Sequence, residues 1–246
     1  MFILLFCVGL RLWGIDFMIS LYSGTPGSGK SLHLAQNIRG RLRFKHPVVG
    51  NFKIRDDVKG ADAYYTFIDN SELTVDALLS FSRSYFASSR SPVREGALLL
   101  VIDECQLLFN SREWQKSGRA EWLSFFTQHR KYGFDVILVA QFDGMIDKQI
   151  RSLIEYQYIH RKLTNFGLRG WFLSLCMLST KMFCAVRVWY PLNERISSEF
   201  FRFHKKDAQI YDTFLDFSDF NGSYATVDVL KAPESDSDSL IDNLYA

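Results

Sequence analysis

The sequence predicts an α/β fold in which helices cover both faces of a mostly parallel β-sheet. Two continuous aliphatic runs, ALLLVIDE (97–104) and DVILVAQ (135–141), are typical of strands that are buried on both faces. A third apolar run, MISLYSG (18–24), leads through glycines into a segment with helical spacing, 31–43. Strands that alternate with helices in this way indicate a parallel sheet. The chain of 246 residues is long enough for one such domain with a small appendage.

Three elements are expected between the helix at 31–43 and the run at 97–104. Residues 47–54 and 63–68 show the pattern of short strands. A helix is expected over residues 69–86, where Asp69 is the predicted cap and Glu72 completes a capping box. The sequence therefore predicts two short strands and one helix before the run at 97–104.

The elements after that run repeat the alternation of helix and strand. A helix is expected over residues 119–133, with Gly133 as its stop signal. A short helix over 144–154 and a strand over 155–163 follow the run at 135–141.

Beyond about residue 165 the pattern loosens. Residues 170–178 and 181–190 are expected to form strands or a hairpin that flanks the sheet, and Lys181 and Arg187 break any run long enough to span a bilayer. We divide the chain into an apolar leader or upstream extension (1–17), a core (18–165), a small β-rich C-terminal extension of the same domain (166–230) and an acidic tail (231–246), expected to be disordered.

Composition narrows the function classes only slightly. The net charge is +2, with four carboxylates and no Lys or Arg in residues 232–246, and such a balance is no nucleic-acid footprint. The four cysteines lack the spacing of a metal site and are expected to be free thiols in a reducing compartment. They are Cys7, Cys105, Cys176 and Cys184.

The first seventeen residues have two interpretations. Their apolar run is too short to span a bilayer, and Arg11 interrupts it. We favour an upstream extension, with Met18 as the functional start, because Met18 begins the strand that leads into the glycine loop. The alternative is a membrane-peripheral anchor.

The glycine loop GTPGSGKS (24–31) fits the phosphate-loop pattern G-x-x-x-x-G-K-[ST] without a mismatch. Backbone N–H groups of such a loop bind phosphates, and the positive end of the following helix adds to the attraction. Lys30 is expected to reach the β- and γ-phosphates of ATP, and Ser31 to coordinate Mg²⁺. The expected ATP-binding residues are Gly24, Thr25, Pro26, Gly27, Ser28, Gly29, Lys30, Ser31 and Leu32. A strand before the loop and a helix after it support the assignment, so the fold is predicted to be that of the P-loop NTPases.

Three further polar side chains follow buried strands at the sheet edge that carries the loop. Asp103 is placed to complete the Mg²⁺ shell, and Glu104 to polarise a water for attack on the γ-phosphate. The alternative for Glu104 is a cap on the next segment. Gln141 is expected to sense the γ-phosphate or orient the water, although an ordinary strand-end residue fits its position almost as well.

Several basic residues are candidates for transition-state stabilisation. Arg130, Arg119 and Arg112 are possible arginine fingers, of which Arg130 is the preferred one; for each, a solvated surface position is the simpler alternative. His129 is expected to pack or hydrogen-bond locally. The basic stretch RGRLRFK (39–45) could contact phosphate backbones, although a solvated helix face is the simpler expectation.

The combination of MISLYSGTPGSGKS, LLLVIDECQ, FFTQHRKYGFDVILVAQ and the later YDTF resembles the zonular occludens toxin family over residues 18–214. That family includes the gene I assembly proteins of filamentous phages. The resemblance implies a P-loop ATPase at the cytoplasmic face of the bacterial inner membrane. Such a protein would power phage assembly and export with a single-stranded DNA genome, as a ring-shaped homo-oligomer that acts with phage assembly proteins. Lys30, Ser31, Asp103, Glu104 and Gln141 match the family's nucleotide-site positions.

Family members commonly continue into a transmembrane helix and a periplasmic domain, which this chain is not expected to contain. Membrane association is therefore expected to be indirect, and toxin activity is not expected. Two other functions are alternatives to a motor-type ATPase. One is a small-molecule or nucleotide kinase, which the acidic pair argues against. The other is a nucleotide-gated interaction module that hydrolyses little ATP. A two-domain helicase would need a longer chain.

Overall fold

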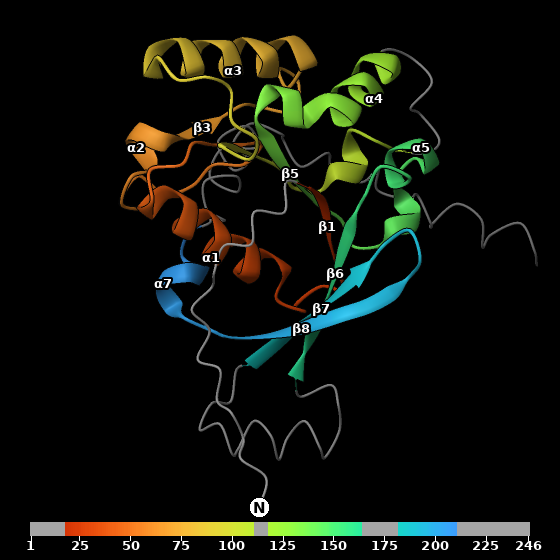
Figure 1. The fold of residues 1–246 in the computed structure, drawn as a ribbon. Coiled ribbons are helices and arrows are strands. Elements are labelled where there is room, and N and C mark those ends of the chain that lie inside the picture. Colours follow the sequence, from red (N-terminus) through yellow and green to blue (C-terminus); the bar gives the residue numbers. More distant parts are fainter. Residues whose placement is uncertain (1–17, 111–117, 164–181, 211–246) are drawn as a thin grey trace, which may run out of the picture. The chain divides into compact units, whose positions relative to one another are not determined.

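An eight-stranded sheet runs through the protein in the order β3-β2-β4-β5-β1-β6-β7-β8 (Figure 1). The computed structural model describes residues 18–110, 118–163 and 182–210, and all of them belong to one compact unit. The strands are β1 (Ile19–Ser23), β2 (Val48–Gly50), β3 (Tyr65–Phe67), β4 (Leu98–Ile102), β5 (Phe134–Val139), β6 (Tyr156–Lys162), β7 (Met182–Trp189) and β8 (Glu194–Arg202). The predicted α/β class is confirmed.

Six strands of the sheet, β3 to β6 in spatial order, are parallel to one another. Strand β5 lies between β1 and β4, with Leu138 opposite Leu21 on one side and opposite Ile102 on the other. Strands β7 and β8 continue the sheet in antiparallel fashion from β6. The carboxyl ends of β1, β4 and β5 therefore meet at one edge of the sheet.

Helices cover both faces of the parallel part. On one face lies α1 (Lys30–Arg43), whose Leu34 and Ile38 pack with Leu99 and Val101 of β4. On the other face lie α3 (Val75–Ser89), α4 (Arg119–Gln128) and α5 (Lys148–Arg151). Because successive side chains of a strand point to opposite faces, β4 must be apolar throughout, as its sequence is.

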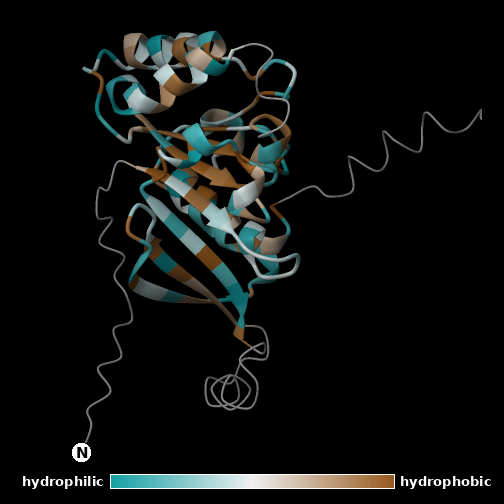
Figure 2. Cartoon of the chain, turned by 90° about the vertical axis from the view of Figure 1, so that its right-hand side faces the viewer, coloured by the Kyte–Doolittle hydropathy of each residue, from teal (hydrophilic) through white to brown (hydrophobic). Residues whose placement is uncertain are grey.

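The central strands are accordingly brown along most of their length in Figure 2, whereas the antiparallel strands carry more teal. The shorter elements are α2 (Ala61–Tyr64), η1 (Cys105–Leu107), η2 (His129–Tyr132), η3 (Asp143–Met145) and α7 (Lys205–Ala208). Cys105 and Cys184 are free and buried. Among the described residues, no helix combines the length and apolarity needed to cross a membrane.

The predicted start of the helix at residue 69 is wrong. The helix α3 begins at Val75, and the Thr74 hydroxyl accepts a hydrogen bond from the Ala77 N–H at 3.2 Å. The Asp69 carboxylate instead accepts from the Ser71 N–H at 2.9 Å and closes a local turn. An Asp followed two residues later by Ser satisfies its own backbone in this way, which competes with capping a helix.

Two other predictions differ from the structure in extent. The predicted helix 144–154 is reduced to one turn, α5, which the Asp147 side chain caps by accepting from the Gln149 N–H at 2.9 Å. The expected strand 181–190 is present as β7, but its partner β8 had not been predicted. The expected strand 170–178, the leader 1–17 and the tail 231–246 lie outside the described residues.

Candidate functional site

The glycine loop connects β1 to α1 at the carboxyl edge of the sheet, as predicted. Its first residue is tied to the end of β5, because the Gly24 N–H donates to the Gln141 carbonyl at 3.2 Å. Within the loop the Ser28 N–H donates to the Thr25 carbonyl at 3.1 Å. Thr25, Pro26 and Gly27 are exposed. The loop is thus anchored to the sheet at one end and open to solvent at its tip.

The start of α1 is suited to an anion. Gly29 provides no side-chain cap, and the first turn holds no acidic residue. The N–H groups of Lys30, Ser31 and Leu32 have no acceptor inside the helix, which leaves the positive end of its dipole open. Among the residues that the structure describes, the buried Ser28 hydroxyl has no hydrogen-bond partner. These orphan donors fit a phosphate group; the buried side chain of Leu32 allows it to take part only through its backbone.

Lys30 places its ammonium group against the loop. Its Nζ donates to the Gly24 carbonyl at 2.6 Å and to the Thr25 carbonyl at 3.4 Å. Partial burial lowers the pKa of Lys30, and the carboxylates of Glu104 and Asp103 oppose that shift. The loop lysine and the acidic pair therefore share one electrostatic site.

Asp103 follows β4 directly and is held by a residue from the neighbouring strand. The Asn51 side chain, just after β2, donates to the Asp103 carbonyl at 2.9 Å and accepts from the Asp103 N–H at 2.7 Å. Burial raises the pKa of Asp103 to about 6, with Glu104 adding to the shift and Lys30 opposing it. A divalent cation would stabilise the ionised form, so the surroundings of Asp103 fit the role expected of it in holding Mg²⁺, while Ser31 lies exposed in the first turn of α1.

Glu104 has an unusual backbone conformation for a residue with a side chain. Its φ is 45°, in the left-handed region, and its N–H donates to the Asp103 carboxylate at 2.9 Å. The Gln106 amide donates to the exposed Glu104 carboxylate. Strained residues of this kind persist where the surroundings hold them in place, which is common at active sites. The geometry keeps the carboxylate beside Asp103 and accessible to water.

A hollow of about 460 Å³ adjoins the loop, within the usual size range of ligand pockets. Gln141, at the end of β5, lines it together with Gly24 and Thr25. The opposite wall comes from β6, which contributes Gln157 and Arg161. Gln141 thus contacts the phosphate loop in two ways: its carbonyl accepts a hydrogen bond from Gly24, and it lines the same hollow as Gly24 and Thr25.

The sequence analysis did not identify the β6 residues that line the hollow or the two hydrogen bonds from Asn51 to the Asp103 backbone. The Gln157 amide donates to the Ser23 hydroxyl at 2.8 Å, and Arg161 is exposed in the hollow. Alternation along the predicted strand 155–163 places Gln157 and Arg161 on the same face, which was the available signal. Asn51 directly follows a predicted strand segment, but only the sheet order shows that it reaches Asp103.

Two buried histidines connect the loop to the antiparallel strands. His160 Nδ1 lies 3.1 Å from the Ser23 carbonyl, and His160 Nε2 lies 2.9 Å from His33 Nδ1. Since a carbonyl only accepts, His160 donates to Ser23 and must accept from His33. His33 Nε2 is 3.6 Å from the Glu199 carboxylate on β8. Burial, followed by the charge of His33, lowers the pKa of His160 to about 3.

The predicted arginine fingers lie away from the loop in their own chain. Arg130 precedes β5, at the amino edge of the sheet, and pairs with Glu155 at 2.5 Å. Arg119 bonds to Gln149 at 3.2 Å and lies 3.7 Å from Asp147, while Arg112 lies outside the described residues. In its own chain Arg130 therefore lies at the sheet edge opposite the phosphate loop. His129 is buried and bonds locally to the Phe126 carbonyl at 2.5 Å.

Comparison with known proteins identifies relatives of this arrangement. A family model described as "Zonular occludens toxin (Zot)" matches residues 18–209. The "Gene 1 protein" of Escherichia phage If1 is 41% identical over 153 residues, which are 59% of this chain and 42% of that protein. The "Gene 1 protein" of Enterobacteria phage M13 is 39% identical over 71 residues, 28% of this chain and 20% of that protein. The chain thus spans less than half the length of these relatives.

Solved structures resemble this chain at low sequence identity. The ATPase domain of G40P has a TM-score of 0.50 and 10% identity, and the match covers 77% of this chain and 82% of that one. The N-terminal domain of zonular occludens toxin from Neisseria meningitidis has a TM-score of 0.49 and 19% identity, over 79% of this chain and 98% of that one.

Proposed function

Because this chain belongs to the zonular occludens toxin family, we propose that it is a motor-type ATPase that serves filamentous phage assembly and export. The observation that carries the proposal is that a phosphate loop, an acidic pair and a polar strand-end residue lie together at one edge of the sheet. The phosphate loop ends with Lys30, the acidic pair follows β4, and Gln141 follows β5 with its carbonyl bound to the loop. The "Gene 1 protein" relatives come from phages, which supports the role in assembly.

In the proposed reaction the loop N–H groups and Lys30 hold the phosphates of ATP. Ser31 and Asp103 would hold Mg²⁺, whose charge would neutralise the phosphates of the nucleotide. Glu104 accepts a proton from the attacking water, and Gln141 orients that water or senses the γ-phosphate. The left-handed backbone at Glu104 and its bond from Gln106 support this role, because they fix the carboxylate next to the cation site.

We propose further that the active form is a ring of identical subunits at the cytoplasmic face of the inner membrane. The position of Arg130 at the opposite sheet edge supports a role in trans, after its pair with Glu155 opens. The proposed partners are phage assembly proteins in the membrane, and the proposed cargo is the single-stranded DNA genome. Membrane association would be indirect, through these partners.

Steady-state ATP hydrolysis by the full chain tests the proposed reaction. We expect Lys30→Ala to weaken ATP binding and to abolish turnover, and Glu104→Gln to retain ATP binding while turnover falls by a factor of about 100 or more. Glu121→Gln and Lys131→Ala change exposed charges on and next to α4 and should leave both unchanged.

Tight ATP binding by the unchanged chain, with no turnover either alone or with single-stranded DNA, would favour the nucleotide-gated interaction module instead. Phosphate transfer to an added acceptor, in place of phosphate release, would favour a kinase.

A further inference from the structure

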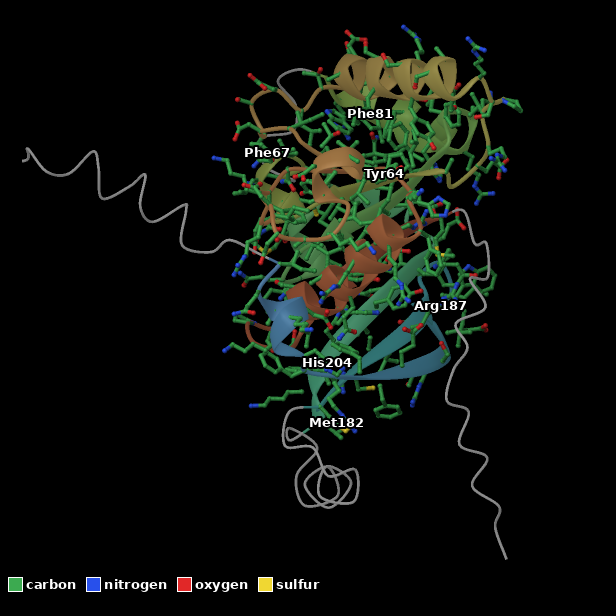
Figure 3. The ribbon with its side chains drawn as sticks, turned by 90° about the vertical axis from the view of Figure 1, so that its left-hand side faces the viewer. Tyr64, Phe67, Phe81, Met182, Arg187 and His204 are labelled. Carbon is green, nitrogen blue, oxygen red and sulfur yellow. The ribbon has the colours of Figure 1, made fainter. Side chains whose placement is uncertain are left out.

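A second concave site lies away from the loop, on the side of the protein that Figure 3 faces. It is a hollow of about 650 Å³ between the C-terminal half of α1 and the short helix α7. Figure 3 shows α7 beside α1, with His204 close to α7. The lining residues are Arg39, Arg43, Lys59, His204, Lys205, Lys206 and Asp207, and we call this hollow the basic groove.

The single carboxylate of the basic groove is already engaged. Asp207 is buried, and its Oδ1 accepts from Arg39 at 2.7 Å while its Oδ2 accepts from Gln36 at 3.1 Å. Both oxygens are therefore used to attach α7 to α1. The remaining cations of the groove receive no neutralisation from Asp207.

Four cations line the basic groove without a counter-charge. Arg43, Lys59, Lys205 and Lys206 are exposed, and in the part of the chain that the structure describes none of them forms an ion pair. Like charges that gather in a concavity repel one another and raise the local concentration of anions. Three separate chain segments supply them, so this is more than the solvated face that the stretch 39–45 alone suggests.

We propose that the basic groove binds the phosphate backbone of single-stranded nucleic acid. The inference rests on the proposed role in phage assembly: phosphate contacts by Lys and Arg supply sequence-independent affinity, which a protein that handles a whole genome would require. A concave groove fits a flexible strand better than it fits the flat surface of a membrane.

The affinity of the full chain for a fluorescein-labelled oligothymidylate, followed by fluorescence anisotropy at several salt concentrations, tests the proposal. Four phosphate contacts predict a slope of log affinity against log salt of about −3. Lys205→Gln with Lys206→Gln should reduce that slope by about 1.4 and weaken binding at low salt by a factor of about 10 or more. The matched control is Arg83→Gln with Lys131→Gln, which removes two exposed cations elsewhere and should have little effect.

Two results would overturn the proposal. One is equal loss of affinity in the groove variant and in the control, which would indicate a diffuse charge effect. The other is a groove variant that binds the oligonucleotide normally but no longer binds vesicles containing phosphatidylglycerol, which would make the groove a lipid-headgroup site. The measurement needs no ATP turnover, so its failure is separate from a failure of the proposed ATPase.

Discussion

Two glycines of the phosphate loop provide a matched test of the structure, because the same added methyl group meets different surroundings. A Cβ at Gly24 would lie 2.6 Å from the His160 carbonyl oxygen and 2.7 Å from the Ser28 hydroxyl, and Gly24 has a φ of 145°. A Cβ at Gly27 would meet nothing within 4 Å, and its φ of 72° is a conformation that alanine adopts with modest strain. The two substitutions therefore differ in the space available and in backbone strain, because φ 145° lies farther than φ 72° from conformations that alanine adopts.

The expected free energies follow from these contacts. For Gly27→Ala the left-handed backbone costs about 1–2 kcal/mol, part of which is offset by the lower entropy of the unfolded chain. For Gly24→Ala we expect a loss of about 3 kcal/mol or more, because backbone strain adds to a collision with a backbone atom that cannot move without shifting β6.

Urea unfolding of the full chain, followed by tryptophan fluorescence and circular dichroism, measures both losses. Gly24→Ala should unfold at a clearly lower urea concentration than Gly27→Ala, with a similar dependence on urea for both. Equal destabilisation of the two variants would refute the close approach of the loop to β6, and with it the tie between the loop and the buried histidines.

Two other predictions concern the residues that support the site. Asn51→Ala leaves the N–H and carbonyl of Asp103 without their partners, so it should cost about 2 kcal/mol in urea unfolding and reduce ATP turnover, with Asn51→Asp restoring only the bond from the Asp103 N–H. His160 should make folding sensitive to acid: its pKa is about 3 when folded and 6.5 ordinarily, so the unfolded chain takes up a proton that the folded chain refuses. Through this group, the free energy of unfolding should fall by about 1.4 kcal/mol for each pH unit below pH 6.5. The variant His160→Asn should remove that pH dependence. An unchanged pH dependence in the variant would mean that other groups cause the acid sensitivity.

The elements that the sequence predicts well are those whose pattern depends on local burial. The aliphatic runs that became β4 and β5 are apolar, apart from Asp135 near the start of β5, because helices cover both of their faces. The strand β8 escaped prediction because it is an edge strand with most of its residues exposed, including Ile196 and Phe200. Its position depends on pairing with β7 rather than on a pattern of its own.

The candidate site was predictable where the functional residues are neighbours in one short segment of the sequence. The loop residues and the pair Asp103 and Glu104 each form such a segment. The order of the strands was not predictable from periodicity, and it decides that Asn51 reaches Asp103. Likewise His33 and His160 are 127 positions apart and meet only because β6 lies next to β1.

The helix α1 belongs to both proposed sites. Its first residue, Lys30, lies in the phosphate loop, and its last residue, Arg43, lines the basic groove about 20 Å further along. Its middle is tied to the C-terminal elements, through His33 to Glu199 and through Arg39 to Asp207. If α1 moves as a rigid body, a shift of the loop on nucleotide binding reaches the groove as a movement of α1 with α7. Any such coupling must be reciprocal: if ATP changes the affinity for a nucleic-acid strand by some factor, the strand must change the affinity for ATP by the same factor.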